Sequence, residues 1–570
     1  MDVIVLLGFI VGALVLAAIV NAFSTQKKIK RFILRLKKNF GVVERKEYDP
    51  EKYSSYRGYF LRHLDDDGFF IDEITWNDAE GETLYNSLNK SYSSCGDEYL
   101  YYRLRHIDNS ISEEERERFI SQTDALIEDE ATRIKLQLKF ATLGKTGKHS
   151  VFEYINLLSN VKKVPLILFY VVWAVYALII GTYFINVTLG VCLTLIWMVV
   201  CVIIYLMHKK SVEEYITSFE YIVRTLITCE KIVGMKVPFY DIECEELTKQ
   251  RKELKGVKTS YLSFIKQSNR SGITDMMSGM TAILNSFLLL DIFFFYKMLK
   301  YVCDKEDAYD KIFTILGKME SQVSIANLKY AYEDTCVPTF TDEKILKAED
   351  MIHPLVFDCV ANSFENKKGM LITGSNASGK STFLRSVLVN AILSETVYVA
   401  CAKEFIMQPS ILFSSMSLKD SLASGESYYM AEINSIKRIL EAKKNDDNVI
   451  CFLDEVLRGT NTVERVAAAT EILRYLTGEN IITLAATHDI ELTYLLEKDY
   501  DNYFFREEIK KDENEKEDIY FSYKINNGRS ETRNALLLLK IKGYPEEIYS
   551  SAEGLSKGFM DTGKWQYDEG

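Results

Sequence analysis

The sequence lacks the cysteine patterns that indicate a disulfide framework or a zinc site. Its 10 cysteines are scattered, with no C-x-x-C pair and no neighbouring histidines. Cysteines with this distribution are typical of a reducing compartment, where they act as small apolar residues. We therefore expect neither bound zinc nor structural disulfide bonds. The chain also contains no internal repeat and no low-complexity segment, which excludes the repeat architectures.

Positive charge is in short supply along the chain. It has 69 lysine and arginine residues against 81 aspartate and glutamate residues, which gives a formal net charge of −12. This balance argues against a protein that binds nucleic acid through a surface that is basic throughout. A local basic site remains compatible with it.

Charged residues are absent from one long segment, which runs from Pro165 to Met207. It is about twice as long as a single helix needs to cross a bilayer, so it predicts a membrane hairpin at residues 164–207. The run from Val3 to Val20 is also apolar and predicts a further span within residues 1–22. The sequence thus predicts three transmembrane helices, with the lipid bilayer as a partner.

Basic residues flank these apolar segments and predict their orientation. They lie at 27–38 after the first span, at Lys162 and Lys163 before the hairpin, and at 208–210 after it. By the positive-inside rule, everything except the N-terminus and one short loop lies in the cytoplasm. We therefore expect a multi-pass protein of the cell membrane. The stretch at 27–38 could instead bind nucleic acid, but its place beside a span favours anionic lipid.

Residue patterns divide the remainder of the chain into domains. They predict a basic juxtamembrane segment and linker at 23–69, an all-α core at 70–163 and again at 208–345, and an α/β domain at 346–570. Within the second helical part, residues 284–295 could form a fourth span. Their short apolar length and the interior Asp291 favour a buried helix instead.

A glycine-rich segment within the α/β domain predicts a phosphate-binding loop. Residues 374–381 read Gly-Ser-Asn-Ala-Ser-Gly-Lys-Ser, between the apolar run Met370–Thr373 and a helix-forming segment. Glycines let backbone N–H groups turn toward nucleotide phosphates, and the helix N-terminus adds partial positive charge. Lys380 should reach the β- and γ-phosphates, and the Ser381 hydroxyl should bind Mg²⁺. The residues predicted to bind the nucleotide are Gly374, Ser375, Asn376, Ala377, Ser378, Gly379, Lys380, Ser381 and Thr382.

Two further strands end in residues that suit the same site. The apolar run 448–453 leads to Asp454 and Glu455, and the run 481–486 leads to His488. The carboxyl ends of parallel strands face the ligand crevice of an α/β sheet. Asp454 can hold the hydration shell of Mg²⁺, Glu455 can polarise the attacking water, and His488 can sense the γ-phosphate. ATP and Mg²⁺ are therefore the expected cofactors.

Three segments, in this order, closely resemble the ATPase motifs of the MutS mismatch-repair family. They are Thr373 to Thr382, Asp454 to Thr462 and Ala486 to Thr493. Asp420 to Glu432 is similar to the signature segment of that family, and Gly543 to Ile548 is similar to its closing segment. The resemblance extends over roughly residues 70 to 560. It implies an α/β P-loop ATPase domain of the ABC/MutS type, preceded by an all-α core and lever.

The resemblance also implies a function. It indicates an ATPase that works as a homodimer with composite sites, in which Lys380, Glu455 and His488 are catalytic. Ser427 of one subunit would approach the γ-phosphate held by the other. Ser427 is also a good helix-cap residue, but its position in the signature segment favours the functional role. The implied substrate is DNA, mismatched or branched.

The chain departs from the family at several positions. The family usually has Arg at Glu426, Thr at Tyr428 and Gly at Leu457. We find no segment that resembles the mismatch-reading domain, for which only about 70 residues precede the core. The sequence therefore predicts a divergent, membrane-anchored MutS-like ATPase without direct mismatch reading. The alternative is an ATP-driven membrane mechanoenzyme or regulator that has no nucleic-acid substrate.

Overall fold

The chain forms two units in the computed structural model. The residues that the structure describes are 20, 23–147, 149–153, 164–257, 286–375, 378–416, 428–444, 447–511, 517–530, 535–541 and 543–565. The helical unit comprises residues 1–67, 85–104 and 111–332, and the α/β unit comprises 68–84, 105–110 and 333–570.

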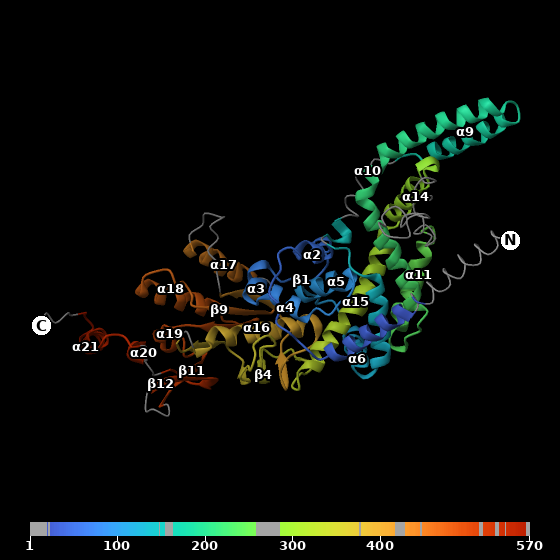
Figure 1. Cartoon of the computed structure of the whole chain (residues 1–570). Helices are drawn as coiled ribbons and strands as arrows, with labels where there is room; N and C mark the ends of the chain where they lie inside the picture. Colours follow the sequence, from blue (N-terminus) through green and yellow to red (C-terminus); the bar gives the residue numbers. More distant parts are fainter. Residues whose placement is uncertain are drawn as a thin grey trace. The chain divides into compact units, whose positions relative to one another are not determined.

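A six-stranded sheet forms the centre of the α/β unit (Figure 1). All neighbouring strands pair in parallel except β11 and β12, which form an antiparallel hairpin. The apolar runs noted in the sequence are the buried central strands, as in other parallel sheets covered on both faces. The predicted α/β architecture is confirmed. In order across the sheet the strands are β12 (Glu517–Asn527), β11 (Asp501–Lys511), β6 (Met370–Thr373), β10 (Ile481–Ala486), β9 (Val449–Asp454) and β8 (Ile411–Ser415).

Helices cover both faces of this sheet. Ile439, Leu473 and Leu492, from three of them, share one apolar core with Leu371 and Cys451 of the strands. The helix after β6 contributes nothing to that core but contacts β8, β9 and β10, so it covers the opposite face. The helices are α16 (Lys380–Val397), which follows β6, and α17 (Tyr428–Ala442), α18 (Thr462–Tyr475) and α19 (Ile490–Leu495), which build the core.

A smaller sheet and two C-terminal helices complete the α/β unit. The small sheet has the strand order β3-β7-β4-β5. Its strand β5 contacts β12 of the larger sheet. The elements are β3 (Thr339–Phe340), β4 (Leu346–Met351), β5 (Asn362–Asn366), β7 (Glu404–Met407), α20 (Ala535–Ile541) and α21 (Glu546–Thr562).

A segment from the N-terminal part of the chain packs on the edge of the six-stranded sheet. Helix α3 (Glu73–Asp78) contacts the edge strand β8, and its Trp76 is fully buried. The Asp78 carboxylate accepts hydrogen bonds from Ser414 Oγ at 2.6 Å and from the backbone N–H of Met416 at 2.9 Å. α3 thereby covers a strand edge that would otherwise be open to pairing.

This segment changes the domain boundaries that the sequence suggested. We expected all of residues 70–163 to belong to the helical core, whereas 68–84 and 105–110 join the α/β unit. Two short strands in these ranges, β1 (Phe69–Phe70) and β2 (His106–Ile107), pair with each other. The reason is packing between residues more than 300 positions apart, which local patterns do not reveal.

The helical unit is organised around one long buried helix. Most residues of this helix from Ala308 to Leu328 are buried, so it forms the core of the unit. The helices are α2 (Tyr53–Arg62), α4 (Gly81–Leu88), which begins in the α/β unit, α5 (Ser94–Arg105), α6 (Glu113–Glu128), α7 (Glu130–Leu143), α9 (Ile167–Tyr183), α10 (Val187–Val233), α11 (Asp241–Glu253), α14 (Leu290–Asp304) and the central α15 (Glu306–Ala331), with the 3-10 turn η1 (Pro238–Tyr240).

The predicted membrane hairpin corresponds to α9 and α10, which pack against each other (Figure 1). One helix in the described part of the chain is long and apolar enough to cross a membrane, over Val187–His208. α9 has 17 residues, slightly fewer than the roughly 20 that a span needs. The expectation of three such helices is therefore not met. The span predicted within residues 1–22 lies almost wholly outside the described residues.

The second arm of the hairpin does not end where the sequence predicted. We expected it to stop at residue 207, but α10 is a single helix of 47 residues that continues to Val233. The change from an apolar to a charged composition near His208 leaves the backbone helical, because charged residues form helices as readily as apolar ones. The apolar arm and the helical unit are thus joined by continuous helix.

Residues 290–295 of the apolar segment at 284–295 lie in a buried helix, which is the alternative that the interior charge favoured. In α14, Ile292, Phe293 and Phe295 are buried. Leu289, just before this helix, has φ of +53°, which marks a break in the helical backbone.

Candidate nucleotide-binding site

The glycine-rich segment connects the end of β6 to the start of α16, as predicted. Gly374 and Gly379 have φ of +141° and +102°, values that favour glycine. A Cβ atom on Gly374 would lie 2.9 Å from Ser378 Oγ and 3.0 Å from the carbonyl oxygen of Phe505. The loop therefore needs glycine for both conformation and space. The predicted residues Asn376 and Ala377 lie outside the described residues.

The side chain of Lys380 points back into its own loop. Its Nζ donates hydrogen bonds to the carbonyl oxygens of Gly374 at 2.5 Å and Ser375 at 2.9 Å. Burial of the ammonium group lowers the pKa of Lys380 to about 8, against the opposing effect of the Asp454 and Glu455 carboxylates. This amine lies where an anionic ligand would compensate the cost of its burial.

Ser381 and Asp454 meet at the base of the loop. Ser381 Oγ donates a hydrogen bond to Asp454 Oδ2 at 2.5 Å. The two residues come together because β9, which ends in Asp454, is separated from β6 only by β10 in the sheet. Burial raises the pKa of Asp454, and the bond from Ser381 opposes this effect. A hydroxyl and a carboxylate side by side are the oxygen ligands that Mg²⁺ prefers.

Glu455 and His488 face each other beside the loop. His488 Nε2 lies 2.8 Å from Glu455 Oε1, and Arg458 Nε donates to Glu455 Oε2 at 2.9 Å. The contact with His488 is the main cause of a lowered pKa of Glu455. The same His488 nitrogen lies 3.4 Å from Lys380 Nζ. Since one nitrogen cannot donate to a carboxylate and accept from an amine at once, the tautomer of His488 selects between these partners.

The structure thus gathers the predicted residues of three strand ends at one edge of the sheet. The predicted residues that the structure describes at this edge are Gly374, Ser375, Ser378, Gly379, Lys380, Ser381 and Thr382 of the loop, together with Asp454, Glu455 and His488. Ser427 lies outside the described residues, as do the rest of residues 417–427. Its predicted role therefore stays a prediction.

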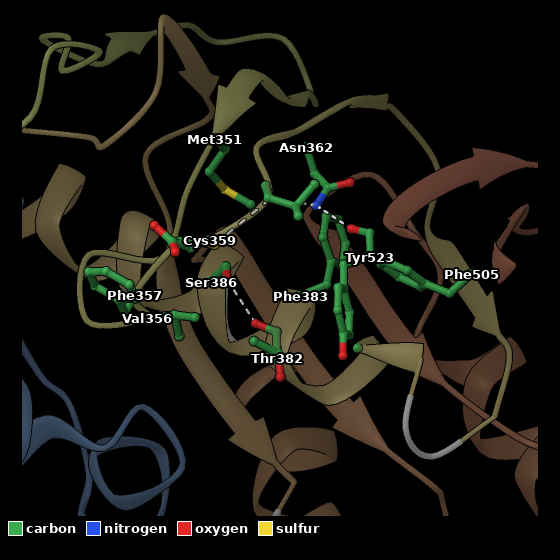
Figure 2. A pocket seen from close by; sticks show the side chains of 13 residues that line it. Met351, Val356, Phe357, Cys359, Asn362, Thr382, Phe383, Ser386, Phe505 and Tyr523 are labelled. Carbon is green, nitrogen blue, oxygen red and sulfur yellow. Dashed lines mark hydrogen bonds between the residues drawn. The ribbon is translucent and has the colours of Figure 1, made fainter. Parts of the chain in front are cut away.

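A cavity of about 310 Å³ adjoins the loop (Figure 2). Gly379 and Thr382, at the start of α16, form one wall. Aromatic side chains form much of the remainder, and Asn362 Nδ2 donates to the carbonyl oxygen of Tyr523 at 3.0 Å across it. The lining residues are Met351, Val356, Phe357, Asp358, Cys359, Val360, Asn362, Gly379, Thr382, Phe383, Ser386, Phe505 and Tyr523.

No pattern in the sequence indicated this cavity. Its walls come from the segment before β6, from α16 and from the β11–β12 hairpin. Gly379 and Thr382 belong to the predicted phosphate loop, but no motif marks the aromatic residues of the hairpin. The one available signal was position, because α16 begins in the phosphate loop and its first turn must border whatever lies beyond the phosphates.

The comparisons with known proteins agree with this geometry. Residues 370–559 match the family "MutS domain V". The DNA mismatch repair protein MutS of Thermotoga sp. (strain RQ2) is 30% identical over 281 residues, which are 47% of this chain and 35% of that protein. That of Staphylococcus haemolyticus is 30% identical over 44% of this chain and 29% of its own length. The human MutS protein homolog 4 is 28% identical over 42% and 27%.

The chain spans about a third of the length of the curated relatives that it matches. These matches cover less than half of the chain, so the resemblance upstream to residue 70 stays a prediction. Residues 370–559 match MutS domain V, and in this part the chain is similar to proteins of the MutS family.

Proposed function

We propose that this protein binds ATP together with Mg²⁺ and hydrolyses the γ-phosphate. One observation carries the proposal: Lys380, Ser381, Asp454, Glu455 and His488 converge at one edge of the sheet from three separate strand ends. The glycines allow the left-handed conformations and close packing of the loop, and the paired oxygens of Ser381 and Asp454 suit Mg²⁺. Ser381 and Asp454 would hold Mg²⁺, which would neutralise part of the charge of the phosphates.

The residues of the chain divide the work of hydrolysis. The Lys380 ammonium pairs with the phosphates and exchanges its loop carbonyl partners for them. Glu455 is held as a carboxylate by its contacts with His488 and Arg458, and it orients the attacking water. His488 lies between Glu455 and Lys380, where it can contact the γ-phosphate.

The aromatic cavity is the proposed site of the adenine base. It lies beside Gly379 and Thr382, directly beyond the phosphate loop. Tyr523 and Phe383 line it, and aromatic rings stack on nucleobases. This assignment supplies the base-contacting residues that motif analysis did not provide.

Two substitutions test this chemistry. Glu455→Gln should slow hydrolysis at least 100-fold while nucleotide affinity stays within about threefold of the wild type, because only the water-orienting carboxylate is lost. Lys380→Ala should lose nucleotide binding itself. Fluorescent ATP binding and phosphate release measure the two effects, with the exposed Glu464→Gln in α18 as a matched control. Unchanged turnover of Glu455→Gln would contradict the assignment.

We propose that the α9–α10 hairpin anchors the protein in a membrane, with the α/β unit in the cytoplasm. The hairpin exposes apolar side chains along its length, including Leu178, Ile180, Phe184, Leu195 and Val199. A patch of this kind is costly in water and suits a lipid environment. The basic residues on both sides of it support the cytoplasmic orientation.

We further propose that the protein acts on DNA as a homodimer with composite sites. The relatives, which carry the name of DNA mismatch repair proteins, support this substrate class. The second candidate is an ATP-driven membrane device without nucleic acid, favoured by the apolar hairpin and the net charge of −12. Turnover by the detergent-solubilised protein with duplex, branched and mismatched DNA at low salt separates the two: stimulation supports DNA, and indifference supports the membrane device.

A further inference from the structure

Glu432 is a nearly fully buried carboxylate that the proposed chemistry does not use. It lies in the second turn of α17, with 5% of its surface exposed. Its Oε1 accepts two backbone hydrogen bonds, from Leu457 N at 2.5 Å and from Arg458 N at 3.2 Å. Among the described residues, its Oε2 has no hydrogen-bond partner. The carboxylate is therefore directed at a single short stretch of backbone.

That backbone is the turn that presents Glu455. The turn leaves β9 at Asp454, and both Glu455 and Leu457 adopt left-handed conformations, with φ of +58° and +59°. Residues with side chains rarely adopt this conformation, and they keep it only where neighbours hold it. Glycine adopts this conformation without strain, but neither position is a glycine. Contacts with neighbouring residues must therefore hold the turn.

The contacts form a chain from Glu432 to the site. Glu432 accepts from the backbone N–H of Arg458, and the side chain of Arg458 donates to Glu455 Oε2 at 2.9 Å. Tyr429 of α17 borders the same turn, since a Cβ added to Gly459 would lie 3.5 Å from its ring. The first turns of α17 thus lie against the turn after β9, and Glu432 supplies the hydrogen bonds between them.

We propose that Glu432 is a positioning residue for hydrolysis: its carboxylate fixes the Leu457–Arg458 backbone and so aims Glu455 at the attacking water. The inference rests on the proposed ATPase function, in which Glu455 orients that water. Glu432 itself touches neither the phosphate loop nor the residues that hold Mg²⁺. Removing it should therefore affect the rate of hydrolysis and leave nucleotide binding intact.

Three variants of the full-length protein test the proposal. Glu432→Ala removes both backbone contacts, whereas Glu432→Gln keeps an oxygen that can accept them. The control is Glu441→Ala, which removes an exposed carboxylate from the same helix. We expect kcat of Glu432→Ala to fall at least tenfold, with nucleotide affinity within about twofold of the wild type. Glu432→Gln should recover most of the rate, and Glu441→Ala should behave as the wild type.

Hydrogen exchange without nucleotide supplies a readout that does not depend on activity. In Glu432→Ala the amides of Leu457 and Arg458 lose their acceptor and should exchange at least tenfold faster, with little change in the strand β9. If these amides exchange as in the wild type, or if kcat and affinity fall together, the positioning role is refuted. If the wild type itself neither binds nor hydrolyses ATP, the proposed function fails, and exchange still decides whether Glu432 holds the turn.

Discussion

Glu98 shows how a single buried group links the stability of the helical unit to pH. Its side chain is fully buried in α5, and its Oε2 accepts from Ser150 Oγ at 2.6 Å and from Tyr59 N at 2.9 Å. Burial nevertheless dominates and raises the pKa of Glu98 from 4.5 to about 8. Glu320 in α15 is buried in the same way, and its pKa is also raised to about 8.

These pKa values predict a loss of stability as pH rises. Between about 4.5 and 8, the unfolded chain has released the protons that the folded chain still holds at Glu98 and Glu320. The free energy of unfolding should therefore fall through this window and become level above it. The glutamine in Glu98→Gln cannot titrate, so this variant should lose the contribution of Glu98 and keep that of Glu320. The fall in the free energy of unfolding with pH should then be about half as steep. Denaturant unfolding of the detergent-solubilised protein from pH 5 to 9 measures it.

A control for this prediction is available at the surface of the same unit. Glu114→Gln removes an exposed carboxylate from α6 and should leave the pH dependence unchanged. If Glu98→Gln has the same slope as the wild type, the proton on Glu98 is not the cause.

At the scale of elements, α3 packs on β8 and so connects two segments that are far apart in the sequence. Asp78 is buried and supplies acceptors to Ser414 and Met416 on the strand edge. Arg438 of α17 links the two segments further, because it forms an ion pair with Asp72, just before α3, and donates a hydrogen bond to the carbonyl oxygen of Ser414 in β8. Residues 68–84 are thus a structural part of the α/β unit.

Substitution of Asp78 should destabilise the α/β unit. Asp78→Ala leaves buried donors on β8 without their acceptor, which costs about 2 kcal/mol. The loss should appear as a lower midpoint of unfolding for the α/β unit, and as aggregation if the strand edge becomes exposed. Glu479→Ala, which removes an exposed carboxylate of the same unit, serves as the control. Equal midpoints for the two variants would show that Asp78 does not stabilise the packing of α3 on β8.

The sequence predicted those parts of the fold and site that depend on local patterns. The run of apolar residues before Asp454 identified a central strand, and the glycine spacing before Lys380 identified the loop. Contacts between distant segments could not be predicted from the sequence. They are the packing of α3 on β8, the aromatic cavity around Tyr523, and the contact of Glu432 with the turn after β9. Each of these joins segments through side chains that have no fixed spacing in the sequence.

At the scale of the whole molecule, the continuous helix α10 links an apolar arm to the helical unit. The apolar part, Val187–His208, meets the length and composition of a span, whereas α9 has 17 residues. A span of that length reaches across about 26 Å at 1.5 Å per residue, which a bilayer accommodates by thinning locally. Under the proposed membrane anchoring, the turn between the helices would lie on the far side of the membrane.

This topology predicts that the two ends of the hairpin are reached from opposite sides. In a variant whose native cysteines are replaced by serine, Phe184→Cys at the exposed turn should react with a membrane-impermeant maleimide on intact cells. Lys236→Cys, beyond the end of α10, should react only after the cells are permeabilised. If Phe184→Cys is unreactive before and after permeabilisation, the turn lies within the bilayer and the hairpin does not cross it. If Lys236→Cys reacts on intact cells, the cytoplasmic placement of the α/β unit is wrong.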